Sequence, residues 1–193
     1  MTPKLVIASK GDFDIKHLME IHYSHPNGFV GRQIMYKVLD ENNKFCGAIA
    51  GGSATVHLPG REEFFGDEFE LQQIVNNTFY HLLDVEDINF GTKVLKLWRR
   101  KIVEDWQKLY EDRVIGFETL VELPRTGSIY KADNWTLTGT TKGYTCRRVG
   151  GNSDSEKFGG VRVWDYDNLK PKLVFCKLNT YRPEVVISHK KLF

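Results

Sequence analysis

The chain contains no apolar run long enough to cross a membrane, a span that takes about 20 residues. Near the N-terminus only residues 5–8 form an apolar stretch, between Lys4 and Lys10, which is too short for the hydrophobic segment of a signal peptide. No membrane partner is therefore expected. The sequence predicts a soluble protein of the cytoplasm.

Cysteine is scarce, and neither sign of charge dominates. Cys46, Cys146 and Cys176 are far apart and lack the paired spacing of a zinc site, so we interpret them as reduced core residues and predict no metal ligands. The 27 basic and 25 acidic side chains leave a net charge of only +2. A nucleic-acid partner must therefore be sought in local clusters of lysine and arginine rather than in the total charge.

The sequence does contain alternating strand and helix patterns. Strand-like runs cover residues 4–8, 33–39, 44–50, 70–75, 113–121 and 173–178, and the apolar run 79–83 is either a short strand or a buried loop. Helical periodicity covers 13–23, 92–110 and 129–134. This order predicts an α/β (α+β) fold with a mixed, mostly antiparallel sheet and a few flanking helices. We expect one domain over residues 1–193, with the Gly- and Ser-rich run 150–160 as a flexible loop.

The turn before the longest predicted helix is a candidate phosphate site. The segment 88–110 begins with Asn89, Gly91, Thr92 and Lys93, where a helix leaves backbone N–H groups unpaired. The helix dipole favours an anion at this end. The alternative is an ordinary capped helix, because one glycine is far less specific than a glycine-rich fingerprint.

Basic side chains cluster in two places. Both clusters suit contacts with nucleic-acid phosphates, and the second surrounds Tyr144, whose ring suits stacking on a base. On the helix, a solvated face with ion pairs between positions four apart explains the charges equally well. The candidate DNA-contacting residues are Arg99 and Arg100 on the helix, and Lys142, Arg147 and Arg148 beyond it.

Three side chains are candidates for proton transfer. Glu118 lies in the middle of an apolar strand, where a carboxylate must be paired, protonated or functional. Tyr130, in the polar segment 127–135, is either an acid or a core aromatic residue with a polar tip. His22 begins the compact stretch HYSH and is either a general base or a structural histidine.

Longer motifs resemble two known protein families. Similarity to the DruA proteins of Druantia anti-phage systems spans about residues 30–180 and rests on LQQIVNNTFYHL (71–82), INFGTKVLKLWRRKIVEDWQKLY (88–110), IGFETLVE (115–122) and IYKADNWTLTGTTKG (129–143). The segment 22–54 and the IYKADNW turn also resemble the phage Mom proteins, which are GNAT-fold enzymes that modify the exocyclic amine of adenine in DNA.

These resemblances imply a GNAT-type fold in which residues 89–93 hold the pyrophosphate of an acyl-coenzyme A donor. Tyr130 matches the tyrosine of the Mom turn and would protonate the departing thiolate. Glu118, with His22, would remove a proton from the base amine. One position departs from the Mom pattern, because Leu120 stands where Mom proteins have an aspartate.

Two functions are consistent with these features. The first is a DNA-modifying acyltransferase of phage or mobile-element origin, acting in the host cytoplasm with an acyl-coenzyme A donor and DNA as partners. The second is a non-catalytic, DNA-binding component of a phage defence or counter-defence system, which would keep the fold but not the donor site.

Overall fold

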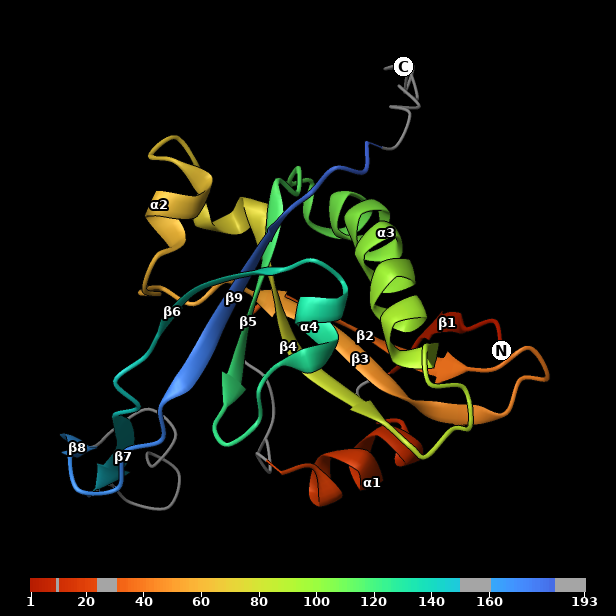
Figure 1. The fold of residues 1–193 in the computed structure, drawn as a ribbon, viewed down its shortest axis with the longest axis horizontal. Helices are drawn as coiled ribbons and strands as arrows, with labels where there is room; N and C mark the ends of the chain where they lie inside the picture. The colour runs from red at the N-terminus through yellow and green to blue at the C-terminus, as the bar shows by residue number, and fades with distance from the viewer. Residues whose placement is uncertain (10, 24–30, 150–160, 183–193) are drawn as a thin grey trace, which may run out of the picture.

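The computed structural model describes residues 1–9, 11–23, 31–149 and 161–182 (Figure 1). The elements in chain order are β1 (Lys4–Ile7), α1 (Phe13–Ile21), β2 (Gln33–Leu39), β3 (Phe45–Ser53), α2 (Arg61–Phe65), the 3-10 helix η1 (Leu71–Gln73), β4 (Ile74–Leu82), α3 (Phe90–Tyr110), β5 (Gly116–Glu122), α4 (Ser128–Ala132), β6 (Thr136–Thr140), β7 (Thr145–Val149), β8 (Val161–Asp165) and β9 (Lys172–Leu178). The predicted flexible loop 150–160 lies outside the described residues. Among the described helices, none combines the length and apolar character that a membrane span needs.

Seven strands form one sheet in the order β1-β2-β3-β4-β5-β9-β6. Neighbouring strands are antiparallel, except that β4 and β5 run parallel, because the long helix α3 carries the chain back between them. Strands β7 and β8 form a separate antiparallel pair. The predicted mixed, mostly antiparallel sheet with few helices is confirmed.

Helices cover both faces of this sheet. The apolar stripe of α3 buries Trp98 and Trp106 completely, in a core that also contains Tyr130 of α4. On the other face, α1 buries Ile15 and Leu18 in a cluster with alanines of β3 and a phenylalanine of β4. The predicted helices 13–23 and 92–110 therefore form, within two residues at each end.

Strand β4 is longer than its sequence suggests. The runs 70–75 and 79–83 were predicted as separate, yet the chain is extended through Asn76 and Asn77 as one strand. These polar residues stay in the strand because β3 pairs with the backbone and the Asn77 amide donates to the Ala50 carbonyl oxygen at 2.8 Å. The short helix α2 and the strands β6, β7 and β8 were not predicted.

The predicted strand 44–50 extends further, so that Gly51 lies inside β3 under α3. A Cβ atom at Gly51 would lie 2.6 Å from Ile102 Cδ1 and 2.8 Å from Val75 Cγ1, closer than carbon atoms pack. Glycine at this position therefore allows α3 to lie close to the sheet.

We expect Gly51→Ala to destabilise the fold by about 1–3 kcal/mol, because three core side chains must shift to admit one methyl group. Chemical denaturation of the purified variant measures the change. Gly11→Ala is the matched control, since a Cβ atom there meets nothing within 4 Å. Equal stability of the two variants would contradict this account of the packing.

Candidate functional site

A cleft opens where β4 and β5 separate. The two strands pair only from Ile74 opposite Gly116 to Asn76 opposite Glu118, and then diverge toward their C-terminal ends (Figure 1). The cleft between them has a volume of about 1000 Å³. Its lining consists of residues 21–23, 55, 76–82, 119–121, 124–130 and 172. This volume lies at the upper end of the range for small-molecule sites.

One wall of the cleft is an unpaired strand edge. Beyond Asn76, β4 is paired to β3 but has no strand on its other side among the described residues. The register with β3 shifts between Asn77 and Phe79, so Thr78 is the extra residue of a β-bulge. An unpaired edge offers backbone donors and acceptors to an extended ligand that carries amide groups.

The phenol of Tyr130 lies at the back of the cleft. Its hydroxyl donates to Asn77 Oδ1 at 2.7 Å, and the Thr119 hydroxyl lies 3.4 Å from the phenol oxygen. Burial raises the pKa of Tyr130 above the usual range of a phenol, so the group keeps its proton at neutral pH. This arrangement suits either a proton donor or a tie between α4 and β4.

Aromatic rings form a second wall. The His22 ring centroid lies 4.7 Å from that of Phe79 and 5.4 Å from that of His81. Arg125 lies 3.5 Å above the ring of Tyr23, and this contact ties the end of α1 to the turn before α4. Such a wall suits a planar ligand. Of the HYSH stretch, Ser24 and His25 lie outside the described residues.

Glu118 is buried completely, and both of its oxygens have partners. Oε1 accepts from the Thr55 backbone N–H at 2.6 Å, and Oε2 accepts from Arg61 Nη1 at 2.9 Å. Burial raises the pKa of the Glu118 carboxyl, against the opposing effect of Thr55 and Arg61. The side chain is not among those that line the cleft. A base role for Glu118 stays a prediction, and its contacts fix the loop between β3 and α2.

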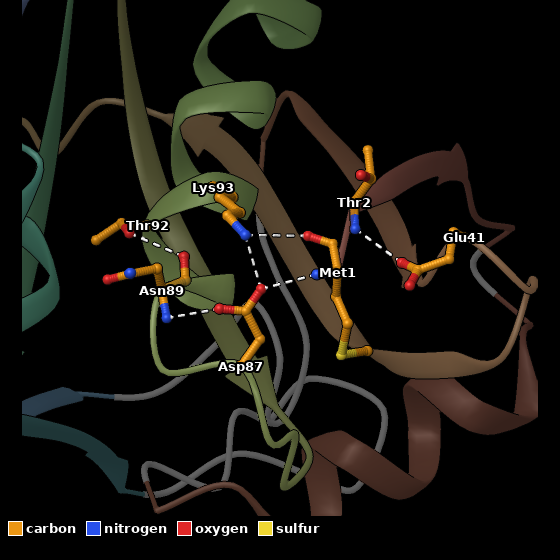
Figure 2. Close-up of polar contacts among 7 residues, drawn as sticks. All are labelled: Met1, Thr2, Glu41, Asp87, Asn89, Thr92 and Lys93. Carbon is orange, nitrogen blue, oxygen red and sulfur yellow. Dashed lines mark hydrogen bonds and ion pairs between the residues drawn. The ribbon is translucent and has the colours of Figure 1, made fainter.

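The four predicted cofactor-binding residues lie together at the start of α3. Figure 2 shows three of them, Asn89, Thr92 and Lys93. The Thr92 hydroxyl donates to the Asn89 carbonyl oxygen at 2.9 Å, and the backbone N–H groups of Gly91 and Thr92 have no acceptor in the described part of the chain. Lys93 Nζ donates to Asp87 Oδ2 at 2.7 Å. The Lys93 ammonium group holds the pKa of Asp87 well below its usual range, so this helix end already faces a carboxylate.

Gly91 connects this helix start to the cleft. The Tyr80 hydroxyl donates to the Gly91 carbonyl oxygen at 2.6 Å, and a Cβ atom on Gly91 would lie 2.7 Å from Ile129 Cδ1. Tyr80 and Ile129 both line the cleft. Glycine is therefore needed for packing against α4, and the free N–H groups lie at the border of the cleft.

The predicted DNA-contacting residues do not form one surface. Arg99 forms a two-point ion pair with Asp133, at 2.8 Å for each bond, with both side chains largely buried. Arg100 lies 5.1 Å from the ring centroid of Tyr181. Lys142 is exposed in the segment between β6 and β7, and Figure 1 shows β7 far from α3. The backbone of β7 contains Arg147 and Arg148, whose side chains lie outside the described part.

Sequence reasoning missed Asn77 and His81. Asn77 is 53 residues from Tyr130, its hydrogen-bond partner, and no local signal connects them. The alternation of β4 would have shown that His81 shares a face with Phe79, had the strand been predicted as continuous. Burial lowers the pKa of His81, which is therefore neutral at pH 7. No three His, Cys, Asp or Glu side chains in the described ranges are placed to hold a metal ion.

Comparison with solved structures identifies the fold. A putative acetyltransferase from Acinetobacter baylyi ADP1 matches with a TM-score of 0.55 and 9% identity, over 92% of this chain and 93% of that one. The spermidine N-acetyltransferase of Vibrio cholerae matches with a TM-score of 0.50 and 7% identity, over 92% and 94% of the two chains. The chain thus has the GNAT acetyltransferase fold, which the sequence resemblances implied.

Comparison of sequences identifies a family. The sequence profile of Druantia protein DruA matches residues 1–147, which include the start of α3 and every lining residue of the cleft except Lys172. The resemblance noted from the VNN, RR–DW and YKADNW motifs is confirmed by this match. No curated protein sequence matches the chain.

We expect Arg61→Met to destabilise the protein by about 3–5 kcal/mol, because it leaves the Glu118 carboxylate buried without its cation. Lys172→Met is the control, since it breaks only the partly exposed 3.8 Å pair with Glu122. Chemical denaturation at pH 7 measures both variants. If Arg61→Met were as stable as the control, the buried pair would have no structural importance.

Proposed function

Since the chain belongs to the family of Druantia protein DruA and has the fold of GNAT acetyltransferases, we propose that it is an N-acyltransferase. It would move an acyl group from a coenzyme A thioester to the exocyclic amine of a DNA base. The observation that carries the proposal is the 1000 Å³ cleft at the divergence of β4 and β5, with a protonated phenol at its back.

The donor half of the site is assigned to β4 and the start of α3. The pantetheine arm of coenzyme A contains amide groups, which match the unpaired edge of β4. Its pyrophosphate fits the free N–H groups of Gly91 and Thr92, at the positive end of the helix dipole. The carboxylate of Asp87 would repel an anion there. Pyrophosphate binding would therefore require the Lys93 side chain to turn from Asp87 toward the phosphate.

The transfer step needs one proton acceptor and one proton donor. The amine nitrogen attacks the acyl carbonyl carbon, the C–S bond breaks, and the sulfur leaves as a thiolate. Tyr130, which keeps its proton, is positioned to protonate that thiolate once its hydrogen bond to Asn77 opens. His81 is neutral, lines the cleft and makes no hydrogen bond to other described residues. We therefore assign to His81 the role of accepting the proton that the amine loses.

The acceptor half of the site is assigned to the aromatic wall. Rings of His22, Phe79 and His81 suit stacking on a flat base, which must leave the DNA duplex to enter. Lys142, near β7, is exposed and available to DNA phosphates. Arg99 is engaged by Asp133, so its contribution to DNA binding would require that pair to break.

A second candidate function is a DNA-binding defence component without catalysis. The observation that favours it is the carboxylate of Asp87, which already pairs with Lys93 and places a negative charge beside the start of α3. Salt-dependent DNA binding without any response to coenzyme A would support this function over the first.

We expect acetyl-coenzyme A to raise the melting temperature, because a ligand that binds only the folded state stabilises it. DNA incubated with the protein and acetyl-coenzyme A should yield an acylated nucleoside in the mass spectrum of a digest. Tyr130→Phe should still bind acetyl-coenzyme A but lower the turnover by about 10²–10⁴-fold. An unmodified digest and an unchanged melting temperature would exclude the transferase.

The pH profile of turnover tests His81. Because burial lowers its pKa below the usual 6.5, His81 remains a free base at neutral pH, and activity should fall only in more acidic buffer. His81→Gln should be slower at all pH values and lose this acidic limb of the kcat/KM profile. An unchanged acidic limb in His81→Gln would assign the proton transfer to another group.

A further inference from the structure

The lining of the cleft carries positive charge without a negative counterpart. Among the described residues that line it are two cations, Arg125 and Lys172, and no aspartate or glutamate. Cations that line a concave surface focus the electric field and raise the local concentration of anions. The cleft therefore favours a ligand that carries an anionic group.

The two cations lie together at the C-terminal end of β5. Lys172 is the register partner of Glu122, the last residue of β5. The backbone N–H of Arg125 donates to the carbonyl oxygen of the same Glu122 at 3.2 Å. Because β4 and β5 diverge beyond Glu118, this end of β5 lies at the open end of the cleft.

The guanidinium of Arg125 is held in place, yet its N–H donors are free. It lies 3.5 Å from the ring centroid of Tyr23, and this contact restricts the side chain. The side chain makes no hydrogen bond or ion pair with another described residue, whereas the guanidinium groups of Arg32, Arg61 and Arg99 each pair with a carboxylate. A stacked guanidinium keeps its planar fork of donors for a phosphate and loses little conformational entropy on binding.

Two hydroxyl groups and a second cation surround Arg125. Thr126 and Ser128 follow it in the turn before α4, and both are exposed and line the cleft. Neither hydroxyl makes a hydrogen bond with another described residue. The Lys172 ammonium is only weakly engaged, since its nearest carboxylate oxygen, on Glu122, is 3.8 Å away and both side chains are partly exposed.

The start of α3 offers an anion less charge than this end of the cleft does. Its cation, Lys93, is paired with Asp87 at 2.7 Å (Figure 2). An anion at α3 must therefore compete with a carboxylate, whereas an anion at Arg125 meets a guanidinium that has no carboxylate partner among the described residues.

We propose that the open end of the cleft contains a subsite for a phosphate ester. Its donors are the side chains of Arg125, Thr126, Ser128 and Lys172. The phosphate belongs either to coenzyme A or to a nucleic-acid acceptor, and the chemistry of recognition is the same for both. This inference goes beyond the proposed function, because the subsite binds phosphate whether or not an acyl group is transferred.

Titration calorimetry with inorganic pyrophosphate tests the subsite. Arg125→Gln should weaken pyrophosphate about tenfold, the lower end of the range for hydrogen bonds to charged groups, because Arg125 is exposed. Arg113→Gln is the matched control, since Arg113 is also exposed but does not line the cleft, and it should bind pyrophosphate as the wild-type protein does. Equal affinities of the two variants would overturn the inference.

Two further probes identify the source of the phosphate. Coenzyme A and a short single-stranded oligodeoxynucleotide are titrated separately into the wild-type protein and both variants. A loss of affinity in Arg125→Gln that is confined to coenzyme A assigns the subsite to the donor, and a loss confined to the oligonucleotide assigns it to the acceptor. Unchanged affinity for both probes would overturn the inference.

The outcomes separate this inference from the proposed function. Oligonucleotide binding that depends on Arg125, without any binding of coenzyme A, would leave the subsite standing and exclude the donor. Coenzyme A binding and an acylated nucleoside, both unaffected by Arg125→Gln, would leave the transferase standing and overturn the subsite.

Discussion

The separation of β4 from β5 is the constraint on which the rest of the site depends. Parallel strands that paired along their full length would satisfy their backbone groups with each other and leave no space between them. Here pairing stops at Asn76 and Glu118, and the edge of β4 beyond that point is left for a ligand. Tyr130 and His81, the two groups assigned to proton transfer, both line the cleft that this separation opens.

Two ion pairs fix the segments on either side of the cleft. The buried pair of Arg61 and Glu118 fixes the loop after β3 on one side of β5, where Arg61 also donates to the Thr55 carbonyl oxygen. On the other side, Asp133 accepts from Arg99 and from the Trp135 indole. The carboxylates of Glu118 and Asp133 are shielded from solvent, so water does not compete for their hydrogen bonds.

The sequence was informative where a local pattern decided the structure. The helical periodicity of residues 92–110 predicted the length of α3. The apolar neighbours of Glu118 predicted that this carboxylate must be paired, protonated or functional. The pairing itself could not be predicted, since Arg61 is 57 residues away and its helix has only five residues. Likewise, the continuity of β4 through Asn76 and Asn77 could not be predicted, because the partners of these asparagines become neighbours only after folding.

The two-point ion pair between Arg99 and Asp133 has a mechanical consequence. It fastens the end of α4 to the third turn of α3, so that Tyr130 and the free N–H groups at Gly91 belong to one rigid unit. The distance between these N–H groups and the Tyr130 phenol is thereby set before any ligand arrives. The entropy cost of aligning these groups is met during folding, so a ligand that contacted both would not meet that cost on binding.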